Sequence, residues 1–115
     1  MSETKDETVA FTEQLVRLNG TMAQLFKNGD IRLFTEMNQT VKEMYRIQHA
    51  SENAVLRAVE PECNIIYQNF DMIIAVLRTT ENGEIDAGAQ NAINRFLHNI
   101  DESVINIATA FGLVK

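Results

Sequence analysis

The sequence has little of several residue types, and each shortage excludes a class of protein. Among 115 residues there are one cysteine, one proline, five glycines and no tryptophan. The single cysteine, Cys63, excludes a disulfide framework within one chain, and no Cys-x-x-Cys pair or Cys/His cluster is present to hold zinc. We therefore expect no metal and no cofactor, and a fold that rests on its hydrophobic core alone.

Long apolar runs and an excess of positive charge are also missing. The longest nearly continuous apolar stretch, residues 72–77, is far shorter than the roughly 20 residues that a membrane helix needs. The first eight residues are charged and polar and lack the apolar segment of a signal peptide. The net charge of −6 is a poor match to a phosphate backbone. These features predict a cytoplasmic protein with no membrane segment and no direct binding to nucleic acid.

Apolar residues, by contrast, are plentiful enough for a core. They make up 45% of the chain, which is ordinary for a globular protein and argues against intrinsic disorder. A chain of 115 residues is the usual length of one domain. We expect residues 1–115 to form a single helical-bundle domain.

Turn signals divide the chain into four segments. Asn-Gly-acidic triplets stand at residues 28–30 and 82–84, and Pro61 is placed to begin a helix. Within each segment apolar residues recur three or four positions apart, which is the spacing of one helix face. In the first segment these residues are Phe11, Leu15, Leu18, Met22 and Leu25.

Four amphipathic helices joined by short turns predict an all-α fold, an antiparallel up-down-up-down four-helix bundle. Asp30 and Asp86 are candidate N-caps, and Gly112 is placed to end the last helix. A rival arrangement fuses the second and third helices into one rod kinked at Pro61. The expected helices span residues 4–28, 31–60, 61–81 and 86–112.

The residues that could carry chemistry do not form a recognisable catalytic set. Cys63 follows Pro61 near a helix start, where a thiol pKa can fall, but it shares the register of the core residues, which favours a buried and inert thiol. His49 is the one candidate for another function. It is followed by small residues, as in histidine phosphotransfer domains, which are helical bundles of this size, although Glu52 lies one turn away and would repel a phosphoryl group.

The third segment, residues 61–81, has more apolar residues than one core-facing stripe requires. Ile65, Met72 and Val76 cluster about 100° from its core stripe and flank Asn69. One interpretation is that this helix is simply the most buried of the four. The other is that Ile65, Asn69, Met72 and Val76 bind a second copy or another partner, with the asparagine setting the register of the contact.

Together these patterns predict a non-enzymatic helical bundle that binds other proteins, as adaptors, chaperones and inhibitors do. We expect it to form a homodimer through the third helix. The alternative is a phosphotransfer or signalling module that uses His49. A lower alternative is an acidic decoy that mimics nucleic acid at a basic site, for which a charge of −6 is modest.

Overall fold

The fold is all-α, as the apolar spacing predicts. The computed structural model describes residues 3–28, 32–79 and 86–113, and every regular element in these ranges is a helix. The helices are α1 (Glu3–Asn28), α2 (Leu33–Ala50), α3 (Ala54–Ala58), α4 (Glu60–Thr79) and α5 (Ala87–Ala110).

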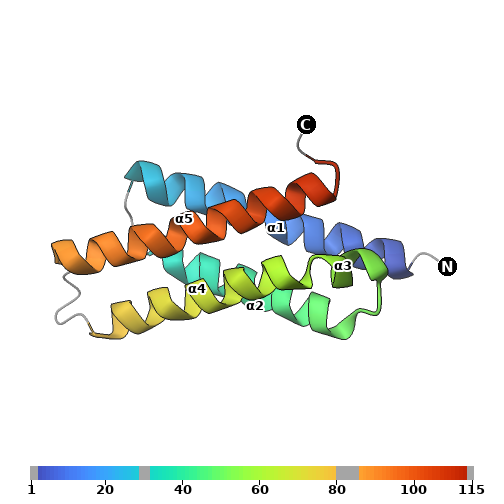
Figure 1. The fold of residues 1–115 in the computed structure, drawn as a ribbon, viewed down its shortest axis with the longest axis horizontal. Coiled ribbons are helices and arrows are strands. Elements are labelled where there is room, and N and C mark those ends of the chain that lie inside the picture. The colour runs from blue at the N-terminus through green and yellow to red at the C-terminus, as the bar shows by residue number, and fades with distance from the viewer. Residues whose placement is uncertain (1–2, 29–31, 80–85, 114–115) are drawn as a thin grey trace.

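The four long helices form two hairpins that pack against each other. α1 and α2 run in opposite directions and pack closely, and so do α4 and α5 (Figure 1). Contacts between α2 and α4, and between α1 and α5, join the two hairpins into a rod of 51 × 28 × 20 Å. The short α3 lies at the end of the rod where α2 leads into α4 (Figure 1).

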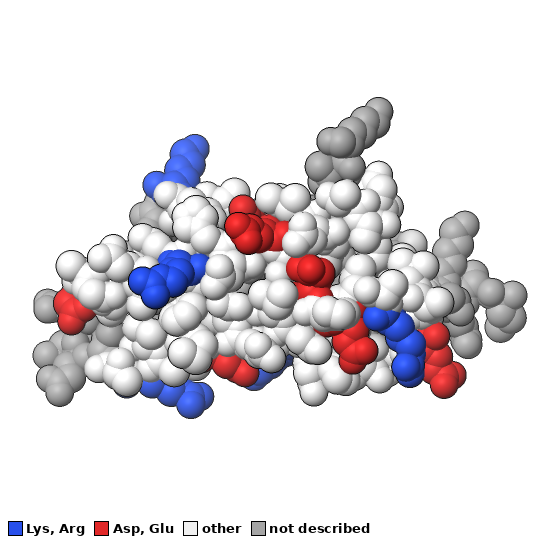
Figure 2. Space-filling model, in the orientation of Figure 1, with Lys and Arg blue, Asp and Glu red and all other residues white. Residues whose placement is uncertain are grey.

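Charged side chains stay on the outside of this rod. On the face formed mainly by α4 and α5, Lys and Arg lie singly, and several Asp and Glu form a loose diagonal line (Figure 2). Broad uncharged areas separate them. In the described ranges, no helix combines the length and the apolar character that crossing a bilayer requires.

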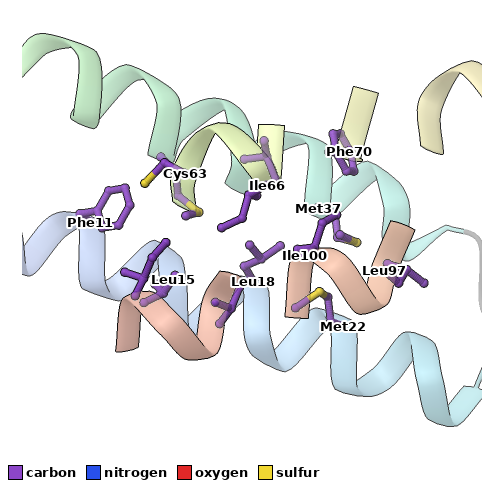
Figure 3. Packing of buried hydrophobic residues seen from close by; sticks show 14 of the residues in the cluster. Phe11, Leu15, Leu18, Met22, Met37, Cys63, Ile66, Phe70, Leu97 and Ile100 are labelled. Carbon is purple, nitrogen blue, oxygen red and sulfur yellow. The ribbon is translucent and has the colours of Figure 1, made fainter. Parts of the chain in front are cut away.

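The interior is filled by the apolar stripes that the sequence predicts. Leu18 of α1, Met37 of α2, Ile66 of α4 and Ile100 of α5 are completely buried and point into one shared core (Figure 3). All five residues of the first predicted stripe are buried, from Phe11 to Leu25. In α5, Leu97 is buried, and its neighbour Phe96 is half-buried against the core.

The predicted helix over residues 31–60 is wrong, and so is the rival rod kinked at Pro61. The chain leaves the helix at Ser51, whose backbone is extended (φ −94°, ψ 143°). It re-enters at α3 because the Asn53 side chain accepts a hydrogen bond from the backbone N–H of Val55, which caps the new helix. A turn at Val59 then separates α3 from α4.

The other predicted boundaries lie close to the observed ones. α1 and α4 each begin one residue earlier than predicted, at Glu3 and Glu60, and α5 ends two residues earlier, at Ala110. Asp86 caps α5 as predicted, since its carboxylate accepts a 2.7 Å hydrogen bond from the backbone N–H of Ala89. The predicted turns at 28–30 and 82–84, the cap at Asp30 and the end of the helix 61–81 lie wholly or partly outside the described residues.

Gly112 ends the last helix, as predicted. Its φ of 76° lies in the left-handed region, which a residue with a Cβ rarely adopts. The backbone N–H groups of Gly112 and Leu113 donate to the carbonyls of Thr109 and Ala108, at 3.0 and 2.8 Å. This is the hydrogen-bond pattern with which a Schellman motif closes a helix.

We expect Gly112→Ala to lower the free energy of unfolding by about 1 kcal/mol, because the added Cβ strains the left-handed backbone. Gly88→Ala is the matched control. Gly88 is helical, and a Cβ there would meet Asp86 at an ordinary 3.5 Å. It should leave stability equal or slightly raised. Urea unfolding of the two variants measures the difference, and equal stabilities would contradict the role of Gly112.

Candidate functional site

The four residues of the proposed binding stripe lie along α4, but they differ in exposure. Met72 is 51% exposed and Ile65 is 39% exposed, both high for large apolar side chains. Asn69 and Val76 are half-buried, and Val76 packs against the core. The structure therefore leaves two apolar side chains of the predicted stripe open at the surface.

Asn69 is already hydrogen-bonded within the chain. Its side-chain amide donates to the carbonyl of Ile65 at 2.8 Å, and its side-chain oxygen accepts from Nδ2 of Asn99 on α5 at 3.0 Å. Farther along the same pair of helices, Asn106 Nδ2 donates to Oε1 of Glu62 at 3.2 Å. The amide of Asn69 thus links α4 to α5.

Sequence reasoning missed the two α5 residues of this face. Glu62 and Asn69 are seven residues apart on α4, and Asn99 and Asn106 are seven apart on α5. Because the two helices are antiparallel, equal spacings place both pairs in contact at once. This matched spacing of polar residues was the available signal.

The segment between α2 and α3 carries two buried polar side chains that bond to α1. Ser51 and Asn53 are 3% and 7% exposed. Ser51 Oγ donates to Oε1 of Glu7 on α1 at 3.0 Å, and Asn53 Nδ2 donates to Oγ1 of Thr8 at 2.8 Å. The Ser51 hydroxyl also accepts the backbone N–H of Asn53 at 3.0 Å. These bonds attach the α2–α3 segment to α1.

His49 lies beside this segment on the surface. Its ring is stacked on Tyr45, with ring centroids 3.9 Å apart. It lines a small hollow of about 80 Å³ together with Arg57 and Glu60, so one cation and one anion flank the imidazole. A phosphoryl group there would be attracted by Arg57 and repelled by Glu60.

Cys63 and Tyr67 lie on α4, where Cys63 is buried and Tyr67 is half-buried. Burial raises the pKa of the Cys63 thiol from 9.0 to about 12, and burial also raises the pKa of Tyr67. Tyr67 donates its hydroxyl to Oε1 of the buried Gln48 at 2.9 Å. Cys63 is thus a buried neutral thiol, as its place in the core register predicts.

Metal-binding clusters and unpaired buried polar atoms are both missing from the described residues. Among them, no three His, Cys, Asp or Glu residues are close enough to hold a metal ion. Within the same ranges, no buried side-chain polar atom lacks a hydrogen-bond partner.

We expect Asn53→Ala to lower the free energy of unfolding by about 2 kcal/mol, because it removes the α3 cap and the bond to Thr8. Asn53→Asp keeps the capping oxygen but removes the donor to Thr8 and places a carboxylate at a position that is only 7% exposed, so it should also destabilise. Glu52→Ala changes an exposed neighbour and should alter stability by less than about 0.5 kcal/mol. Urea unfolding measures all three, and an equal loss for Glu52→Ala and Asn53→Ala would refute the role of the buried amide.

We expect the Cys63 thiol to resist disulfide reagents at pH 8 in the folded protein and to react rapidly in urea. Since its folded pKa is raised, its contribution to stability is complete below pH 9 and is lost as the pH rises toward 12. Cys63→Ala should therefore remove part of the fall in unfolding free energy above pH 9. Rapid labelling of the native protein would contradict the burial of the thiol.

Comparison with known proteins found no relative of this chain. No protein-family model matches the chain, and neither the curated proteins nor the solved structures contain a significant match. The candidate surfaces are therefore interpreted from the residues of this chain alone.

Proposed function

We propose that the protein is a single-domain, non-enzymatic antiparallel four-helix bundle of the up-down-up-down type. It acts in the cytoplasm by binding other proteins, as adaptors, chaperones or inhibitors do, and it pairs with a second copy through the outer face of α4. The proposal includes no metal, no cofactor and no direct contact with nucleic acid or membrane.

The observation that carries this proposal is the exposure of Ile65 and Met72. Their helix already buries a full stripe that includes Ile66, Phe70 and Ile73, so these two side chains have no role in the core. Fully burying a side chain of this size is worth about 1.5–3 kcal/mol, and because Ile65 and Met72 are only 39% and 51% exposed, covering what remains of each is worth roughly half of that. A two-fold contact covers Ile65 and Met72 on both copies, which makes this face energetically suited to self-association.

The surroundings of Ile65 and Met72 also favour a protein contact. Asn69 lies between them, and its amide is paired with Asn99, so covering this face leaves that amide group hydrogen-bonded. Val76 supports the far end of the stripe from a half-buried position. The centre of the face is therefore uncharged, as interface centres usually are.

Phosphoryl transfer at His49 is the alternative. Arg57 in the adjacent hollow favours it, because a guanidinium attracts phosphate. Glu60 in the same hollow opposes it, and Tyr45 covers part of the ring. An acidic decoy ranks lower, since the acidic residues of the visible face form only a loose line (Figure 2).

We expect light scattering coupled to size-exclusion chromatography to show more than one copy of the wild-type chain per particle. Ile65→Glu or Met72→Glu should each weaken the α4 contact at least about tenfold, since a buried carboxylate has no partner there. Val55→Glu is the matched control, because Val55 is 47% exposed but lies on α3. A wild-type monomer, or equal effects of Val55→Glu and Met72→Glu, would refute the α4 contact.

A further inference from the structure

The outer face of α1 carries a seven-residue apolar repeat that points away from the core. Val9, Val16 and Ala23 recur at intervals of seven, and so do Thr12, Asn19 and Phe26. Val9 is 51% exposed, Val16 60% and Phe26 47%. Four of these six residues are apolar, and Thr12 and Asn19 are polar. Residues alternating three and four apart over successive heptads share one side of a helix, along which a second helix can pack. We call these six residues the α1 seam.

The α1 seam continues onto α5, which lies beside α1 (Figure 1). Two adjoining hollows of about 380 and 260 Å³ share Val16, and both are lined mainly by apolar atoms. The second hollow reaches Ile105 of α5 and Leu113 beyond it, which are 47% and 51% exposed. An apolar strip of this length along two helices is shaped for a third helix.

Gly20 lies midway along α1, beside the α1 seam and outside both hollows. A glycine inside a helix weakens it relative to alanine, yet an added Cβ at Gly20 would meet nothing within 4 Å. No contact in the described structure therefore accounts for the missing side chain. Close approach of another helix would account for it, with Ala23 providing a second small contact one turn away.

The charges beside the seam are self-complementary. Glu13 and Lys27 are both exposed and lie seven residues before and seven residues after Gly20. Neither forms an ion pair with another described residue. If a second copy of α1 packs antiparallel with its two-fold axis at Gly20, Glu13 of each copy faces Lys27 of the other. The same register places Val16 near Phe26 of the second copy.

We propose that the α1 seam binds a second copy of this chain, with the two α1 helices antiparallel and crossing at Gly20. The occupant is a second copy because the surface carries both the acid and the base that a two-fold axis requires. This contact is independent of the one proposed on α4. The α1 contact alone makes a dimer; both contacts together close into a tetramer where their two-fold axes intersect at right angles, and otherwise join the copies into an open chain.

A charge exchange tests the antiparallel register. Glu13→Lys and Lys27→Glu each place like charges at both flanks of the contact, so each should weaken association about tenfold. The double variant Glu13→Lys/Lys27→Glu recreates both pairs in reversed order and should restore the wild-type value within about twofold. Circular dichroism and urea unfolding check that each variant folds. Weakening by the single variants without recovery in the double variant would overturn the proposed register.

Two variants, one in the α1 seam and one at Gly20 beside it, test this surface by light scattering. Val16→Glu and Gly20→Leu should each reduce the mass of the particle, while Val55→Glu on α3 should not. If only Met72→Glu reduces the mass, the α4 contact stands and the α1 proposal is overturned. If only Val16→Glu, Gly20→Leu and the charge variants reduce it, the α1 proposal stands and the α4 contact is refuted. A wild-type monomer would overturn both and leave a helix of a different protein as the occupant of the seam.

Discussion

The attachment of residues 51–53 to α1 is the constraint on which the arrangement of the helices depends. Without it, the helical spacing of apolar residues continues from α2 through α3. The hydrogen bonds of Ser51 and Asn53 to Glu7 and Thr8 compensate for burying polar groups at this point. They stop α2, restart the helix at α3 and let α4 return along the rod, which brings the two hairpins together to form one core.

The exposed apolar surfaces follow from how each helix divides its apolar residues between the core and the outside. α4 uses one stripe for the core and leaves Ile65 and Met72 outside, and α1 buries Phe11 to Leu25 yet keeps a second repeat through Val9 and Val16 on its outer side. The polar pairs between α4 and α5 are satisfied within the chain. Function is therefore proposed for the two apolar faces that the core leaves exposed.

Much of the fold could be predicted because helix formation and core register are local in the sequence. The alternation of three and four between Phe11 and Leu25 identified buried positions before any partner helix was known. The break at residues 51–53 could not be predicted in the same way. Ser51 and Asn53 are polar residues in a helical pattern, and their burial makes sense only when Glu7 and Thr8 lie opposite, more than 40 residues away.

For the candidate surfaces too, part could be predicted from the sequence and part depended on the tertiary structure. The sequence by itself determined the all-α class, most of the helix boundaries, the buried stripe of α1, the end at Gly112 and the surplus around Ile65 and Met72, because these depend on spacing and on the conformational limits of single residues. Only the tertiary structure decided that Val76 packs inward, that Asn69 is bonded to Asn99, and that Val16 and Gly20 remain uncovered. Exposure depends on which helix lies alongside, and that is a property of the assembled fold.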